Sequence, residues 1–125
     1  MFKITIVESP VCIAHQLNLP YASKCNMLHG HNYVVEVEIW ADDLNENGMV
    51  VDFSHVKEVI KKYDHAFLGR PINGLVGKIW PHVEPSTAEN FAKILFDEIS
   101  RETSMEPKRV SVWETPNNKA TYDGS

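Results

Sequence analysis

The segment from His31 to Ala41 constrains the fold of this chain more than any other stretch. Side chains at alternate positions point to opposite faces of an extended strand. One face carries Tyr33, Val35, Val37 and Ile39, and the other carries Val34, Glu36, Glu38 and Trp40. This period of two predicts a β-strand that is partly covered on both faces.

A second alternating stretch, from Phe2 to Val7, predicts another strand almost at the start of the sequence. Residues 16–28 are mixed in character and predict a long loop between the two strands. After the second strand, Asn47-Gly48 supplies turn chemistry, and we expect residues 49–51 to continue as the second arm of a hairpin.

Apolar residues spaced three and four apart predict a helix that begins near residue 54 and ends near Tyr63. Asp52 or Ser54 can cap this helix. The following segment, 66–85, is rich in glycine and proline and predicts an irregular connection.

A second helix is predicted from about residue 87 to 102, because Ser86 begins a Ser-x-x-Glu capping box with Glu89. Residues 109–114 alternate as a strand, and residues 120–122 are expected to pair with it after a turn. The order strand, strand, helix, helix, strand, strand predicts an α+β fold.

Length and charge exclude several classes of function. The 125 residues are expected to form one domain, 1–125, whose uncovered strand edges favour a homo-oligomer. The formal net charge is -5 and no run of Lys or Arg is long enough to follow a phosphate backbone, so no nucleic-acid partner is expected. No signal peptide or membrane-spanning segment is recognised, so we expect a cytoplasmic protein without a membrane partner.

The most informative chemical pattern lies between Cys25 and His31. His29 and His31 are two residues apart, so their imidazoles leave the same face of an extended strand. Zinc favours imidazole nitrogen, and catalytic zinc sites commonly use three protein ligands and leave a fourth position open. His15, at the far end of the first strand region, is the best candidate for a third ligand. The alternatives are Glu8, Asp64 and His65.

Cys25 permits two interpretations. A neighbouring divalent metal or imidazolium favours the reactive thiolate, which could exchange protons with a substrate. Cys25 could instead be the fourth ligand of a closed structural zinc site, and spacing does not decide between these. Cys12, between Val11 and Ile13, is predicted to be a small core residue.

Asp64 and His65 close the first predicted helix. They could form a carboxylate–imidazole pair beside the metal, or be a helix end with a favourable cation. Glu114, at the end of a predicted strand, could be an exposed carboxylate or could accept two N–H bonds from an amino-heterocycle. Three cations receive no role because solvated surface charge explains them: Lys24, Arg70 and Lys119.

Six motifs in the same order resemble the 6-pyruvoyltetrahydropterin synthase and 6-carboxytetrahydropterin synthase family over nearly the whole chain. They are Ala14-His15-x-Leu17, Cys25-x-x-x-His29-Gly30-His31-x-Tyr33, Gly48-Met49-Val50-Val51-Asp52-Phe53, Asp64-His65-x-x-Leu68, Pro85-Ser86-Thr87-Ala88-Glu89-Asn90 and Val112-Trp113-Glu114-Thr115. The resemblance implies the tunnelling fold, an α+β fold with a four-stranded antiparallel sheet and two helices on one face. It also implies trimers, usually paired into hexamers, around an oligomeric β-barrel.

The resemblance further implies a zinc ion held by three histidines, a cysteine base, an aspartate–histidine relay and a pterin-anchoring glutamate. These residues are His15, His29 and His31, then Cys25, then Asp64 and His65, then Glu114 with Thr87 and Glu89 nearby. Active sites in the family lie between subunits. Two departures affect substrate detail more than metal binding: Val11-Cys12-Ile13, where a second Ala and an aromatic residue are usual, and Gly69, where Asn is frequent.

The spacing between Cys25 and His29 resembles bacterial and archaeal carboxytetrahydropterin synthases. The implied reaction converts 7,8-dihydroneopterin triphosphate to 6-carboxy-5,6,7,8-tetrahydropterin, with release of triphosphate and acetaldehyde, on the route to the 7-deazaguanine nucleosides queuosine and archaeosine. The alternatives are 6-pyruvoyltetrahydropterin synthase, a dihydroneopterin-cleaving enzyme, and a non-catalytic pterin- or zinc-binding protein.

Overall fold

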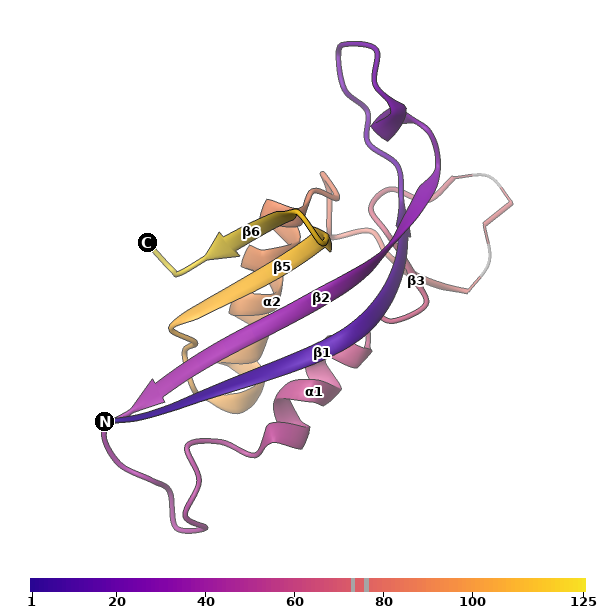
Figure 1. The fold of residues 1–125 in the computed structure, drawn as a ribbon. Coiled ribbons are helices and arrows are strands. Elements are labelled where there is room, and N and C mark those ends of the chain that lie inside the picture. Colours follow the sequence, from indigo (N-terminus) through magenta and orange to yellow (C-terminus); the bar gives the residue numbers. More distant parts are fainter. Residues whose placement is uncertain (73, 76) are drawn as a thin grey trace.

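A computed structural model describes residues 1–125 with the exception of residues 73 and 76. Its strands are β1 (Phe2–His15), β2 (His29–Ala41), β3 (Ala66–Leu68), β4 (Lys78–Trp80), β5 (Arg109–Thr115) and β6 (Asn118–Tyr122). Its helices are α1 (Phe53–Lys61) and α2 (Ala88–Thr103), and both lie on one face of a curled sheet (Figure 1). Within the described residues, no helix is long and apolar enough to cross a membrane.

The sheet has the strand order β4-β3-β1-β2-β5-β6. The antiparallel strands β1, β2, β5 and β6 correspond to the predicted strands, although β1 continues past Val7 to His15, but β3 is parallel to β1, and β4 is parallel to β3. The expectation of four antiparallel strands is therefore incomplete, and residues 66–85 are not wholly irregular. The glycines of this segment lie between β3 and β4, which leaves the buried, apolar β3 free to pair with the end of β1.

The hydrophobic core lies between the sheet and the two helices. The face of β2 that carries Tyr33, Val35, Val37 and Ile39 is at most 1% exposed, as the alternation predicted. The apolar stripes of α1 and α2 cover this face, and their largest fully buried members are Ile60, Phe91, Leu95 and Ile99. The α+β class is confirmed.

The predicted hairpin at residues 49–51 is wrong. The Asn45 side chain accepts hydrogen bonds from the backbone N–H groups of Asn47 and Met49, and Asn45 N–H donates to the Met49 carbonyl. These bonds close a compact loop and replace strand pairing. Val50 and Val51 still reach the core, each with 8% exposure.

The helix ends differ slightly from the predictions. Asp52, rather than Ser54, caps α1 by accepting from Ser54 N–H, and α1 ends at Lys61 rather than near Tyr63. At α2, Thr87 replaces Ser86 as the cap, because the Thr87 hydroxyl accepts from Asn90 N–H. Ser86 is instead buried, with 1% exposure.

Candidate metal centre

Strand pairing brings three histidines together at one end of β1 and β2. His15 lies directly opposite His29 in the antiparallel pair, and His31 is two residues farther along β2. The ring centroids are 4.4 Å apart for His15 and His29, 5.2 Å for His15 and His31, and 4.9 Å for His29 and His31. The histidines named from the sequence therefore form one group.

An irregularity in β1 determines which face His15 occupies. The register of β1 against β2 shifts between Glu8 and Val11. Before the shift the buried side chain is at an even position, Ile6, and after it the buried positions are odd, ending at His15. An extra residue in one strand reverses the faces of everything that follows. His15 reaches the face of His29 and His31 because of this shift.

Two backbone carbonyls fix the protonation of two of the imidazoles. The Nδ1 atom of His15 lies 2.6 Å from the Ser86 carbonyl oxygen, and that of His29 lies 2.7 Å from the Met27 carbonyl oxygen. A carbonyl can only accept, so each Nδ1 carries the proton and each Nε2 keeps a free lone pair. Outer hydrogen bonds of this kind orient metal-binding histidines.

The free nitrogens point to a missing partner. Among the described residues, the Nε2 atoms of His15 and His31 are buried and make no well-directed hydrogen bond, although the Glu114 carboxylate lies close to both. Buried polar atoms without a partner are rare in folded proteins. Burial also lowers the pKa of both imidazoles, although the Glu114 carboxylate opposes this shift. Neutral imidazoles with convergent ring nitrogens are suited to hold a metal ion.

Glu114, at the end of β5, completes the group. Its Oε1 atom lies 3.0 Å from His31 Nε2 and 3.5 Å from His15 Nε2. One ligand atom from each of the three histidines and Glu114 lies within 4.8 Å of the others. Three nitrogens and a carboxylate oxygen are a donor set that zinc accepts. Within the described part of the chain, Glu114 occupies the fourth place in this group, and Cys25 does not belong to it.

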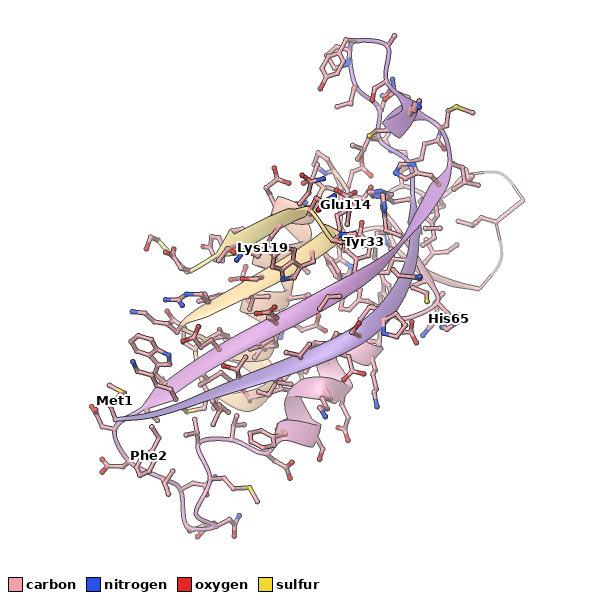
Figure 2. All side chains as sticks on the ribbon, viewed as in Figure 1. Met1, Phe2, Tyr33, His65, Glu114 and Lys119 are labelled. Carbon is pink, nitrogen blue, oxygen red and sulfur yellow. The ribbon has the colours of Figure 1, made fainter. Side chains whose placement is uncertain are left out.

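A cavity of about 290 Å³ opens beside Glu114. Glu89, at the start of α2, and Lys119 line it together with Glu114, whose side chain is 29% exposed. Thr87 lies just before this helix as its cap. The residues that the resemblance associates with a pterin are thus adjacent, and Glu114 faces both the cavity and the histidines. Figure 2 shows Glu114 near Tyr33, with His65 on the far side of β1.

Asp64 and His65 form the carboxylate–imidazole pair suggested by their adjacency, but away from the histidines. The Asp64 Oδ2 atom lies 3.1 Å from His65 Nδ1, and Asp64 Oδ1 accepts from Cys12 N–H at 2.8 Å. The Cys12 N–H bond is the main reason that the pKa of Asp64 is lowered. His65, with 77% side-chain exposure, is presented outward.

Cys25 lies in a 3-10 turn, Lys24–Asn26, within the loop between β1 and β2. Its backbone N–H donates to the Ser23 hydroxyl, and its side chain is half-buried. The loop extends beyond the body of the sheet (Figure 1). Cys25 is therefore carried by a projecting segment that starts next to His15 and ends next to His29.

The sequence analysis did not predict three groups that lie at these two clusters: two backbone carbonyls and the Cys12 side chain. The carbonyls of Ser86 and Met27 belong to residues whose types give no sign of this role, because any residue can supply a carbonyl. Cys12 was expected in the core, but it is half-buried and its thiol donates to Asn32 Oδ1 at 3.2 Å. Its even position after the register shift places it on the face opposite the core.

Comparisons with known proteins agree on one family. A family model described as 6-pyruvoyl tetrahydropterin synthase matches residues 4–125. The 6-carboxy-5,6,7,8-tetrahydropterin synthase of Haemophilus influenzae is 32% identical, over 98% of this chain and 99% of that protein. The protein of the same name from Aquifex aeolicus is 33% identical, over 80% of this chain and 76% of its own. A Pyrococcus horikoshii protein given that name provisionally is 51% identical, but the match spans only 34% of its length.

Solved structures show the same fold. The 6-pyruvoyl tetrahydropterin synthase of Caenorhabditis elegans superimposes with a TM-score of 0.73 and 29% identity, over 99% of this chain and 96% of that one. The corresponding Plasmodium vivax structure gives a TM-score of 0.64 at 18% identity, over 98% of both chains. At this lower identity the likeness concerns the fold alone.

Proposed function

The chain belongs to the 6-pyruvoyl tetrahydropterin synthase family, and on that premise we propose that it is a zinc-dependent 6-carboxy-5,6,7,8-tetrahydropterin synthase of the cytoplasm. Its substrate would be 7,8-dihydroneopterin triphosphate, and its product would serve the synthesis of 7-deazaguanine nucleosides. The near full-length similarity to the Haemophilus influenzae enzyme supports this choice. The observation that carries it is the convergence of three histidine ring nitrogens beside a glutamate-lined cavity.

We propose that His15, His29 and His31 hold the zinc ion. Their imidazoles, two of which are oriented by backbone carbonyls, fit its preference for nitrogen ligands. A zinc ion bound there would act as a Lewis acid toward the side-chain oxygens of the substrate. Metal analysis of the purified protein should find about one zinc per chain at this centre.

Glu114 would bind the pterin ring. A carboxylate that faces the 2-amino group and the neighbouring ring N–H can accept two charge-assisted hydrogen bonds. The alternative role, a fourth zinc ligand, follows from its 3.0 Å approach to His31. Glu114→Gln distinguishes the two: we expect weaker pterin binding in a titration with unchanged zinc content, whereas loss of zinc would assign Glu114 to the metal.

Cys25 and the Asp64–His65 pair would move protons on opposite sides of the substrate carbon framework. In one chain the pair lies beside Cys12 on β1 and does not belong to the histidine group. We therefore propose that a neighbouring subunit of a homotrimer or hexamer supplies the pair to each active site. Cys25→Ala should retain zinc and lose turnover, and full activity in this variant would refute the role of the thiol.

The identity of the pterin product distinguishes the candidate reactions. Zinc-loaded protein is incubated with 7,8-dihydroneopterin triphosphate, the pterin product is identified by mass spectrometry, and acetaldehyde is assayed. Carboxytetrahydropterin with acetaldehyde is the expected result. A pyruvoyl product would instead match the activity named for the Caenorhabditis elegans structure. Binding of zinc and pterin without turnover would favour a binding protein.

A further inference from the structure

A second group of potential metal ligands lies on the opposite face of β1. One ligand atom each from Cys12, Asp64 and His65 lies within 4.8 Å of the other two. Cys12 and His65 also line a cavity of about 470 Å³, together with Asn32. The cavity gives a solute access to the sulfur, so the cysteine is not sealed in the core.

The backbone holds this group in place. Cys12 N–H donates to Asp64 Oδ1 at 2.8 Å, and His65 N–H donates to the Cys12 carbonyl at 2.7 Å. His65 has a φ of 58°, in the left-handed region that few non-glycine residues adopt. These constraints keep the three side chains together although β1 and the segment after α1 are distant in sequence.

The chemistry of the three donors suits a borderline transition-metal ion. Thiolate, imidazole and carboxylate all bind zinc and cobalt. Zinc–ligand bond lengths place tetrahedral ligands about 3.5 Å apart. The three ligand atoms lie within 4.8 Å of one another, so binding would draw them together by at most about 1.3 Å, and the 77% exposure of the His65 side chain leaves room for this movement. The Cys12 thiol would release its proton to solvent when the ion binds.

We propose that Cys12, Asp64 and His65 form a second cation site, distinct from the histidine centre of the same chain, which binds a divalent transition-metal ion through sulfur, oxygen and nitrogen. The same Asp64 and His65 form the proposed proton relay, so an ion bound there would stop turnover. This inhibition rests on the proposed function, whereas the binding does not.

Cobalt(II) titration of the metal-free, full-length protein tests the binding without any activity measurement. A cobalt–thiolate bond gives a charge-transfer band in the near ultraviolet, and the histidine group contains no sulfur ligand. We expect two cobalt ions per chain and a band equivalent to one thiolate. Cys12→Ser should lose the band and one ion, whereas the matched control Cys25→Ser should keep both.

Two further measurements keep the test decisive. His65→Gln should weaken binding of the sulfur-ligated ion at least about tenfold, because loss of an outer-shell partner alone costs that much, while the visible absorption of the histidine-bound ion persists. In the unmutated protein, cobalt should protect Cys12, and not Cys25, from alkylation, as read by mass spectrometry. One ion per chain without a thiolate band, or a band that disappears in Cys25→Ser, would overturn the proposal.

Discussion

The two potential ligand groups on β1 lie three residues apart in sequence and differ in almost every physical respect. His15 is 1% exposed and points toward the helices, whereas the partner group at Cys12 ends in His65, which is 77% exposed. The histidine group, with Glu114 beside it, is assembled from three strands of one chain. The Asp64–His65 pair faces outward, so its function depends on what approaches it. β1 thus contributes to a buried group within one chain and to an exposed group that awaits a partner.

The largest expected effect concerns the outward-facing Asp64–His65 pair, called the outward pair below. Asp64→Asn should reduce turnover by roughly 10²–10⁴-fold, the usual contribution of positioned acid–base groups. Zinc at the histidine centre should be unaffected because Asp64 contacts Cys12 and His65 instead. Turnover and metal content are measured on the same preparation. Loss of zinc in this variant would show that the two groups are not independent.

Removal of the buried His15 imidazole tests the histidine group. His15→Ala should lower zinc affinity by at least about 100-fold, because loss of an outer-shell partner alone costs up to that amount. Competition with a chromogenic chelator gives the affinity. His55→Ala, which changes an exposed histidine of α1, is the matched control and should retain normal affinity. Normal zinc binding by His15→Ala would remove this residue from the centre.

The folding stability of the metal-free protein should depend on pH because His15 and His31 are buried. Burial lowers the pKa of His15 and His31 from 6.5, so below this pH the unfolded chain binds protons that the folded chain does not. Stability should be fully present above about pH 6.5 and fall as the pH decreases, by up to about 1.4 kcal/mol per pH unit for each histidine. Thermal unfolding between pH 7.5 and 5 measures this. A constant midpoint would contradict it.

Asp64 of the outward pair should affect stability in a lower pH range, and this is the smallest of the expected effects. Hydrogen bonding from Cys12 N–H lowers the pKa of Asp64 from 3.8 in the folded state. Its contribution to stability is therefore present above about pH 4 and lost as the pH falls through the lowered value. Urea unfolding between pH 5 and 3 should show a shallower loss in Asp64→Asn than in the unmutated protein. Identical slopes would mean that this hydrogen bond adds no measurable stability.

The sequence predicts most of the features that repeat along the chain. The long alternation in β2 and the helical spacing in α2 were sufficient because each extends over several periods. The strands β3 and β4 have three residues each, too few to show a period, and they form only because the end of β1 offers an edge. Short elements depend on tertiary partners, and local patterns do not contain those partners.

The candidate site shows the same limit. His29 and His31 could be placed on one face from their spacing alone. The face of His15 depends on the register shift at residues 8–11, where Pro10 signals an irregularity in the strand but does not say how the register resumes after it. The Ser86 carbonyl and the position of Cys12 beside Asp64 arise from contacts between segments 71 and 52 residues apart. The residue types of the candidate ligands were readable from the sequence, whereas the face that His15 occupies was not.

The direct pairing of His15 with His29 has a consequence for the loop that joins them. A metal ion bridging this pair would act as a clasp at the base of residues 16–28, and the closed segment could change in length without moving either ligand. The entropy of closing a flexible loop grows slowly, by about 0.6 kcal/mol for each doubling of its length. Insertions between the clasp and Cys25 are therefore inexpensive for the metal centre, yet each one changes where the thiol can reach. The loop can vary in reach while its anchor stays constant.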